Sequence, residues 1–218
     1  MNALSPTERS TVRRGRKRAV TDRTALHAVL DAGIVCHLGF VADGAPIVLP
    51  TGYGRKGDTL YVHGSTGAAS LRAAAEGAEV CATVTLLDGV VYSRAVFHFS
   101  VNYRSAVVHG RARAVTDRAE KLAALRVITD HIAPGSWEYA REPNQRELAA
   151  TAVLALDLTE AAVKIRTGPP GDEPEDLDRP TWAGVLPLTR TWGAPVPCPE
   201  LPAGVAVPEH VTSRPGPA

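Results

Sequence analysis

The amino-acid sequence predicts a mainly β protein in which an antiparallel sheet of six to eight strands forms a small barrel, closed or partly open, with a few helices outside it. Runs rich in β-branched residues recur along the chain, separated by turn signals of two to five residues. Such short connections cannot hold the crossovers that parallel strands require. Only three stretches have a helical pattern, and 218 residues are enough to bury a sizeable core.

Each expected element is bounded by residues that start or stop it. Asp22 can cap a first helix, which Gly33 ends, and Asp117 can cap the longest helix. Asp43-Gly44 and Asp88-Gly89 are hairpin signals between neighbouring strands. The expected strands are, in order, 34–41, 47–53, 59–63, 80–86, 90–100, 104–115, 151–158 and 162–167.

The composition divides the chain into a basic N-terminal arm at 1–20, a barrel domain at 21–167 and a proline-rich, acidic C-terminal arm at 168–218. Six of the eleven residues 8–18 are basic, which is typical of a flexible, solvated arm; a phosphate-binding arm is the alternative. The C-terminal arm holds twelve of the seventeen prolines and cannot build its own core. It carries large apolar side chains, among them Trp182, so we expect it to pack on the barrel or on a partner subunit; a disordered tail is the alternative.

Composition also argues against several classes of protein. The chain has 24 basic and 23 acidic residues, and its net charge of +1 does not suggest a nucleic-acid partner. No apolar run reaches the roughly 18–20 residues that span a bilayer, and the polar N-terminus lacks the apolar core of a secretory signal. Cys36, Cys81 and Cys198 are odd in number and far apart, so neither a disulfide framework nor a zinc site is expected. We therefore expect a cytoplasmic protein with reduced thiols and no membrane partner.

The first candidate site lies at residues 61–67, where a predicted strand is followed by a helix. A helix N-terminus presents unpaired N–H groups and a partial positive charge, which suit a phosphate. Ser65 and Thr66 add hydroxyl donors, and Gly64 and Gly67 let a ligand approach the backbone closely. The alternative is that Ser65 or Thr66 only caps the helix.

The second candidate site is the stretch Phe97-His-Phe-Ser-Val-Asn-Tyr-Arg-Ser105, in which polar and charged groups interrupt a β-rich run. Arg104 offers a planar guanidinium for a phosphate. Asn102 and Ser105 add further polar groups. An exposed strand edge or a structural ion pair is the alternative.

Three histidines, His63, His98 and His109, lie on strand-like runs. Each is expected to be a packed or surface histidine, because no cysteine or carboxylate stands at the spacing of a metal site. The residue pattern therefore predicts no metal site.

Five stretches of the chain together resemble a known family. They are Leu60-Tyr-Val-His-Gly-Ser-Thr-Gly67, residues 80–89, residues 95–112 with Asn-Tyr-Arg-Ser at their centre, Lys164-Ile-Arg-Thr-Gly-Pro-Pro170 and Trp182-Ala-Gly-Val-Leu-Pro187. In this order they resemble the pyridoxamine 5′-phosphate oxidase-like flavoproteins, in the branch related to nitroimidazole reductases. The resemblance runs from about residue 20 to 208. It implies an FMN-binding split barrel that forms a homodimer, with the flavin at the subunit interface.

The resemblance also implies which residues hold the flavin. The backbone of Pro50 and Thr51 would face the ring. The ribityl and phosphate side would be lined by His63, Ser65 and Thr66, with Arg72 as the nearest cation on the following helix. Where relatives often carry a charged residue after the phosphate loop, this chain has Ala68-Ala69-Ser70. The remaining matched positions are Tyr103, Arg104, Ser105 and Trp182.

On this basis we expect an FMN-dependent oxidoreductase that acts on a small-molecule substrate, since the flavin carries the electrons. His63 is the candidate catalytic residue because it lies at a strand end beside the proposed site. One alternative is a split barrel that binds the deazaflavin F420 or haem, with His63, His98 or His109 as an axial ligand. The other is a barrel without flavin that serves as a binding or scaffold protein.

Overall fold

The computed structural model describes residues 3–4, 7–68, 71 and 77–217. The strands are β1 (Ala19–Val20), β2 (Val35–Ala42), β3 (Ala45–Lys56), β4 (Thr59–Ser65), β5 (Glu79–Tyr92), β6 (Ser100–Arg111), β7 (Arg113–Ala114), β8 (Thr151–Asp157), β9 (Ala161–Arg166) and β10 (Gly184–Pro187). The helices are α1 (Arg23–Ala32), α3 (Arg118–Ile132), α4 (Ser136–Tyr139), α5 (Gln145–Ala150) and α6 (Glu209–Thr212). Short 3₁₀ turns are η1 (Arg16–Arg18), η2 (Val96–His98) and η3 (Pro174–Asp176).

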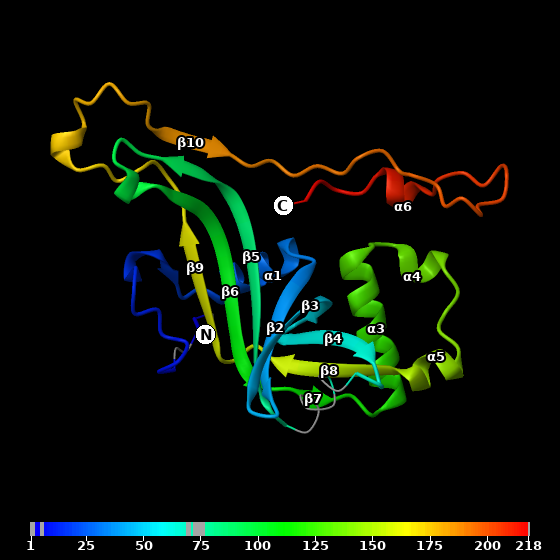
Figure 1. The fold of residues 1–218 in the computed structure, drawn as a ribbon. Helices are drawn as coiled ribbons and strands as arrows, with labels where there is room; N and C mark the ends of the chain where they lie inside the picture. The colour runs from blue at the N-terminus through cyan, green and yellow to red at the C-terminus, as the bar shows by residue number, and fades with distance from the viewer. Residues whose placement is uncertain (1–2, 5–6, 69–70, 72–76, 218) are drawn as a thin grey trace.

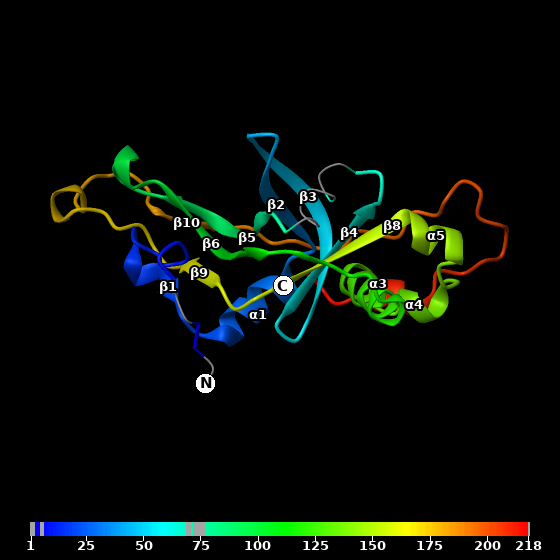
Figure 2. The ribbon, with the colours of Figure 1, turned by 90° about the horizontal axis from the view of Figure 1, so that it is seen from below.

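All of these strands belong to one antiparallel sheet (Figure 1). Its order is β1-β9-β6-β5-β2-β3-β4-β8-β7, and β10 pairs with β5 beside this path. Figure 2 shows β5, β6 and β9 on one side of the molecule and β4, β8 and α3 on the other, with β2 and β3 between them. The predicted mainly β class, with helices outside an antiparallel sheet, is confirmed. The described residues form ten strands, more than the six to eight expected, because β1 and β7 are two-residue strands and β10 lies in the C-terminal arm.

The core lies under α1 and the central strands. Asp22 caps α1 as expected, since its carboxylate accepts from the Thr24 N–H, and the helix buries Leu26, Val29 and Leu30. Side chains alternate along β2, so that Leu38 and its neighbours two residues away are buried while the intervening positions are more exposed. No helix in the described part of the chain is long and apolar enough to cross a membrane.

The two strands expected on either side of Asp88-Gly89 are one strand, β5, so the hairpin turn predicted there is wrong. The pairing of β5 with β6 shifts register between Leu87 and Gly89, which marks a bulge or irregularity in β5. A β-carbon on Gly89 would lie 2.7 Å from the carbonyl oxygen of Leu186, so glycine is required where β10 lies against β5. The chain turns instead at residues 93–99. The helix expected after Ser65 or Thr66 falls largely outside the described residues.

Both arms make contacts with the barrel. In the N-terminal arm Leu4 is buried, β1 pairs with β9, and Arg9 forms ion pairs with Glu79 and Glu160. In the C-terminal arm β10 pairs with β5, and the chain then returns through α6. Arg214 stacks on Trp192 and donates to a carbonyl oxygen of α3. The three-part division of the chain stays a prediction.

Helix α3 lies unusually close to β3. A β-carbon on Gly54 would be 2.6 Å from the carbonyl oxygen of Val127 and 2.8 Å from backbone atoms of Ile128. The neighbouring Tyr53 is fully buried, and its hydroxyl lies 2.5 Å from the Leu30 carbonyl oxygen and 2.9 Å from that of Gly33. The segment around Tyr53 therefore holds α1 and α3 against the same strand.

We expect Gly54→Ala to lower the free energy of unfolding by about 1–3 kcal/mol, because the added methyl group must push the α3 backbone away from β3. Urea denaturation followed by circular dichroism measures the change. Gly193→Ala is the matched control, since a β-carbon there meets nothing within 4 Å. Equal stability of the two variants would contradict the close approach.

Candidate functional site

His63 lies on β4, where β4 pairs with β8, and lines a cavity of about 440 Å³ that we call the His63 pocket. The opposite wall comes from α3, α4 and α5 and the loops between them. The pocket is lined by His63, Leu125, Thr129, Trp137, Arg141 and Glu147, among others. Its lining therefore combines an aromatic and an aliphatic side chain with an imidazole.

The imidazole of His63 is half-buried, and its Nδ1 is buried without a hydrogen-bond partner among the described residues. Burial lowers the pKa of His63 below its ordinary value of 6.5, so the ring is neutral at pH 7. Arg141 and Glu147 already satisfy each other through bonds of 2.5 and 2.9 Å, and this pairing lowers the pKa of Glu147 to about 2. The buried Nδ1 of the neutral imidazole is thus available to a ligand in this pocket.

The hydroxyl groups at the end of β4 have local partners. Ser65 Oγ accepts from the Gly67 N–H at 3.1 Å. The N–H and Oγ1 of Thr66 both donate to the Ala150 carbonyl oxygen, at 3.0 and 3.3 Å, and so tie β4 to α5. Arg72 and the segment with Ala69 lie outside the described residues, so the phosphate-binding role of this loop stays a prediction.

Pro50 and Thr51 lie on β3, opposite His37 and Cys36 of β2. Pro50 is exposed and shares a sheet face with His37, whereas Thr51 is half-buried. We call this exposed face of β2 and β3 the outer face; its members are Val35, His37, Val41, Pro46, Val48 and Pro50. A ligand that touches Pro50 must lie on the outer face.

Arg104 lies on β6, and its guanidinium is bound to the carboxylate of Asp88 through three contacts of 2.8 to 3.2 Å. Hydrogen bonding to Asp88 raises the pKa of Arg104. This is the structural ion pair that the sequence left open as the alternative, so Arg104 already has a counter-ion. Its expected role at a flavin phosphate stays a prediction that these contacts do not support.

The other residues matched on this side of the sheet have few internal contacts. Tyr103 is half-buried, and Ser105 Oγ donates to the Lys164 carbonyl oxygen at 3.2 Å. Trp182 is 67% exposed and packs edge-on against Tyr92, with ring centroids 5.6 Å apart. An indole this exposed remains available to a ligand or to another subunit.

Within one chain the predicted site residues fall into two groups. Pro50, Thr51 and His63 lie on β3 and β4, with Ser65 and Thr66 at the end of β4. Tyr103, Arg104 and Ser105 lie on β6, which β5 and β2 separate from β3. In a single chain the two groups therefore lie on strands that are not neighbours in the sheet.

Sequence reasoning missed a second cavity, of about 500 Å³, that we call the basic pocket. It is lined by Lys17, Arg18, Phe97, His98, Phe99 and Arg166, among others. These residues come from the N-terminal arm, the β5–β6 hairpin and β9. The run of basic residues before β1 was the available signal, but nothing in the sequence placed it beside the other two segments. Among the described residues, no group of three or more His, Cys, Asp or Glu side chains is arranged to hold a metal ion.

A family model described as pyridoxamine 5′-phosphate oxidase matches residues 22–165. The chain belongs to the pyridoxamine 5′-phosphate oxidase family. Its antiparallel sheet with outside helices is the split barrel that the resemblance implied. A comparison with curated protein sequences gives no match.

Two solved structures are similar to this member of the pyridoxamine 5′-phosphate oxidase family over nearly its whole length. The flavocytochrome Anf3 from Azotobacter vinelandii has 38% sequence identity and a TM-score of 0.91, with 96% of this chain and 98% of that chain covered. The FAD and haem binding protein from Mycobacterium smegmatis has 40% identity and a TM-score of 0.88, with coverage of 91% and 98%. Both matches extend beyond the family model and so include most of the arms.

The lowered pKa of His63 predicts a pH-dependent contribution to stability. Between that pKa and the ordinary value of 6.5, the unfolded chain binds more protons than the folded one. The free energy of unfolding therefore decreases as the pH is lowered through this range. His63→Gln removes the titrating imidazole. When the pH is lowered from about 7.5 to about 5.5, the free energy of unfolding of this variant should therefore decrease less than that of the wild type. Chemical denaturation at the two pH values measures it. The same pH dependence in His63→Gln as in the wild type would contradict the burial argument.

Proposed function

We propose that this protein is a flavocytochrome-like oxidoreductase that binds a flavin and a haem and acts as a homodimer on a small-molecule substrate. The observation that carries the proposal is the near-complete overlap, at 38% and 40% identity, with two proteins named as a flavocytochrome and as an FAD and haem binding protein. Proteins that share this much sequence over nearly their whole length commonly share their fold and their site residues. When bound, a flavin supplies one- or two-electron chemistry and a haem supplies one-electron chemistry.

The His63 pocket is the site that fits a haem best. Of the three histidines considered as axial ligands, His63 alone has a buried ring nitrogen without a partner among the described residues. Its burial keeps the ring neutral, and the neutral imidazole is the form that binds a metal. His98 instead lies 3.8 Å from Glu173, and His109 lies on β6, away from this cavity. Leu125 and Trp137 would supply the apolar surroundings.

The flavin is proposed to lie on the outer face at a subunit interface. Pro50 and Thr51 of one subunit and Tyr103 and Ser105 of the other would then contact the same flavin. This arrangement explains why the matched residues fall into two separate groups in a single chain. FAD has more support than the FMN that the family resemblance implies, because the Mycobacterium smegmatis protein is named for FAD. In this scheme His63 acts as a haem ligand and not as a proton donor.

The outer face has the apolar surface that a dimer interface needs. Val41 is 61% exposed and Val48 is 64% exposed, and Pro46 and Pro50 lie beside them. A contiguous apolar patch of this kind on a soluble protein marks an interaction surface. The exposed Trp182 of the C-terminal arm is a further candidate for contact across subunits.

The cofactor content of the purified protein tests the proposal. We expect both flavin bands and a haem Soret band in the wild type, and we expect His63→Ala to lose the Soret band while it keeps the flavin. His109→Ala is the matched control and should keep both. Mass measurement of the released flavin separates FAD, FMN and F420. A wild type without haem, or a full Soret band in His63→Ala, would contradict the assignment.

The interface is tested by Val48→Asp. The introduced carboxylate should be desolvated in a dimer but free in a monomer, so we expect the variant to be monomeric and to retain less flavin. Light scattering coupled to size-exclusion chromatography gives the mass. Val96→Asp, at an 87% exposed position on the η2 turn, is the control and should stay dimeric. A dimeric Val48→Asp would place the interface elsewhere.

A further inference from the structure

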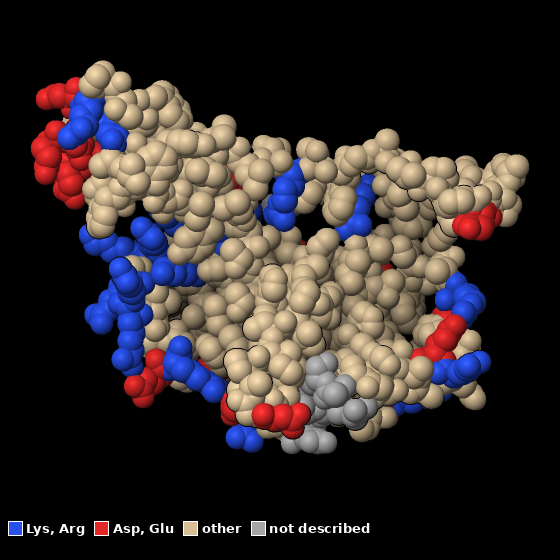
Figure 3. All heavy atoms as spheres, in the orientation of Figure 1, with Lys and Arg blue, Asp and Glu red and all other residues tan. Residues whose placement is uncertain are grey.

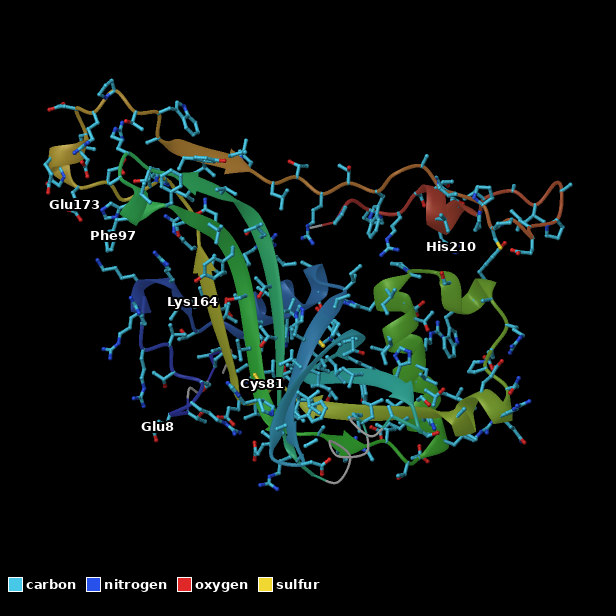
Figure 4. The ribbon with its side chains drawn as sticks, viewed as in Figure 1. Glu8, Cys81, Phe97, Lys164, Glu173 and His210 are labelled. Carbon is cyan, nitrogen blue, oxygen red and sulfur yellow. The ribbon has the colours of Figure 1, made fainter. Side chains whose placement is uncertain are left out.

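The basic pocket lies at the end of the molecule where the β5–β6 hairpin, β9 and the N-terminal arm meet. In Figure 3 the Lys and Arg side chains gather on this flank, below the lobe at the upper left. Figure 4 shows Phe97 at the tip of the hairpin, near Glu173, and Lys164 further along β9. The pocket is a cavity of about 500 Å³ and is separate from the His63 pocket.

Within the described part of the chain, the basic side chains of the pocket have no counter-ion. Arg166 is only 8% exposed, and its guanidinium donates to two neutral acceptors, Asn102 Oδ1 and, at 3.4 Å, the Pro169 carbonyl oxygen. In the described part of the chain, neither Arg166 nor Lys17 nor Arg18 forms an ion pair. Burial, and then the charge of Arg18, lower the pKa of Arg166. A buried cation without an anion is costly, so an anionic ligand here would be stabilised strongly.

The nearby carboxylates do not fill this role. Asp172 is already bound by the Ser93 hydroxyl and by the N–H and guanidinium of Arg94. Glu173 is 3.8 Å from His98, with its side chain 59% exposed. Among the described residues, neither acid forms an ion pair with Lys17, Arg18 or Arg166.

Aromatic rings form the rim of the same cavity. Phe97 is 90% exposed and Phe99 is 47% exposed, although large apolar side chains are normally covered. The 3₁₀ turn η2 holds Phe97 edge-on to the His98 ring, with centroids 5.1 Å apart. Exposed phenyl faces stack on heteroaromatic bases with little preference among them. Cations and exposed phenyl rings around one cavity suit a ligand with both phosphates and a base.

We propose that the basic pocket is a nucleotide site, in which Lys17, Arg18 and Arg166 hold the phosphates and Phe97 and Phe99 hold the base. The register of the sheet places it beside the flavin residues, since Arg166 lies opposite Tyr103 and Lys164 opposite Ser105. The phosphates can come from the ADP half of a bound FAD, a case that rests on the proposed function, or from a free adenine nucleotide. Both sources present the same chemistry to the pocket.

The test uses the protein as purified, with ADP and adenosine as probes and calorimetry as the readout. The variants are Arg18→Gln and Arg166→Gln, and Arg14→Gln is the control because it removes the same charge from an exposed residue that does not line the pocket. Flavin and haem per chain are measured in each variant. Arg18 is exposed, so its replacement leaves the fold intact even if Arg166→Gln does not fold.

Two results support the proposal and identify the source. For a free nucleotide, ADP binds the purified protein saturably, adenosine binds about tenfold or more weakly, and Arg18→Gln loses about tenfold in affinity while Arg14→Gln does not. For the ADP half of FAD, ADP does not bind the flavin-loaded protein, and Arg18→Gln retains less FAD but binds added FMN as well as the wild type does.

Three results overturn the proposal. The first is equal ADP affinity in Arg14→Gln and Arg18→Gln, which would mean attraction by surface charge in general. The second is no ADP binding together with unchanged FAD content in Arg18→Gln. The third is a loss of haem with unchanged nucleotide and flavin binding, which would assign the cations to haem carboxylates. A wild type without flavin or haem would contradict the proposed function alone, because the ADP titration still reports on the pocket.

Discussion

The close contact of α3 with β3 is the constraint on which the rest of the structure depends. It is made by Gly52-Tyr53-Gly54, in which both glycines leave room for α3: a β-carbon on Gly52 would lie 2.7 Å from the Ile132 side chain. Between them the Tyr53 hydroxyl lies within hydrogen-bond distance of carbonyl oxygens at the end of α1, and His131 of α3 bonds to the same Gly33 carbonyl oxygen. One tripeptide thus fixes two helices on one strand. Because α3 also forms a wall of the His63 pocket, the position of that wall depends on Gly52 and Gly54, which have no side chain to keep α3 away from β3.

The sheet order has a similar influence on the flavin site. Between β3 and β6 lie two full strands, so residues that the family resemblance assigns to a single ligand do not lie on neighbouring strands of one subunit. A composite site between two copies reconciles the resemblance with this geometry. It would also make cofactor binding depend on assembly, because neither half of the site is complete alone.

Local signals in the sequence were sufficient for much of the fold. Asp43-Gly44 turns the β2–β3 hairpin, and Asp117 caps α3 by accepting from the Glu120 N–H, because both effects act over a few residues. Asp88-Gly89 carries the same turn signal but is held extended by pairing with β6 and β10, which no local pattern reveals. The candidate site shows the same limit. His63 was identified from its strand end, whereas the basic pocket joins residues 17–18, 97–99 and 166, which only the tertiary fold brings together.

The pairing of β10 with β5 has a consequence for self-association. The C-terminal part of β5 extends past its pairing with β2. Without β10, residues 89–92 would present unpaired N–H and C=O groups to solvent. β10 pairs with these residues, and its own second side is then an edge of the sheet. It is only four residues long and ends at Pro187, and the chain beyond is rich in proline, which has no N–H to donate. The C-terminal arm therefore covers part of the β5 edge with a short strand that leads into proline-rich chain, which disfavours edge-to-edge pairing at this place.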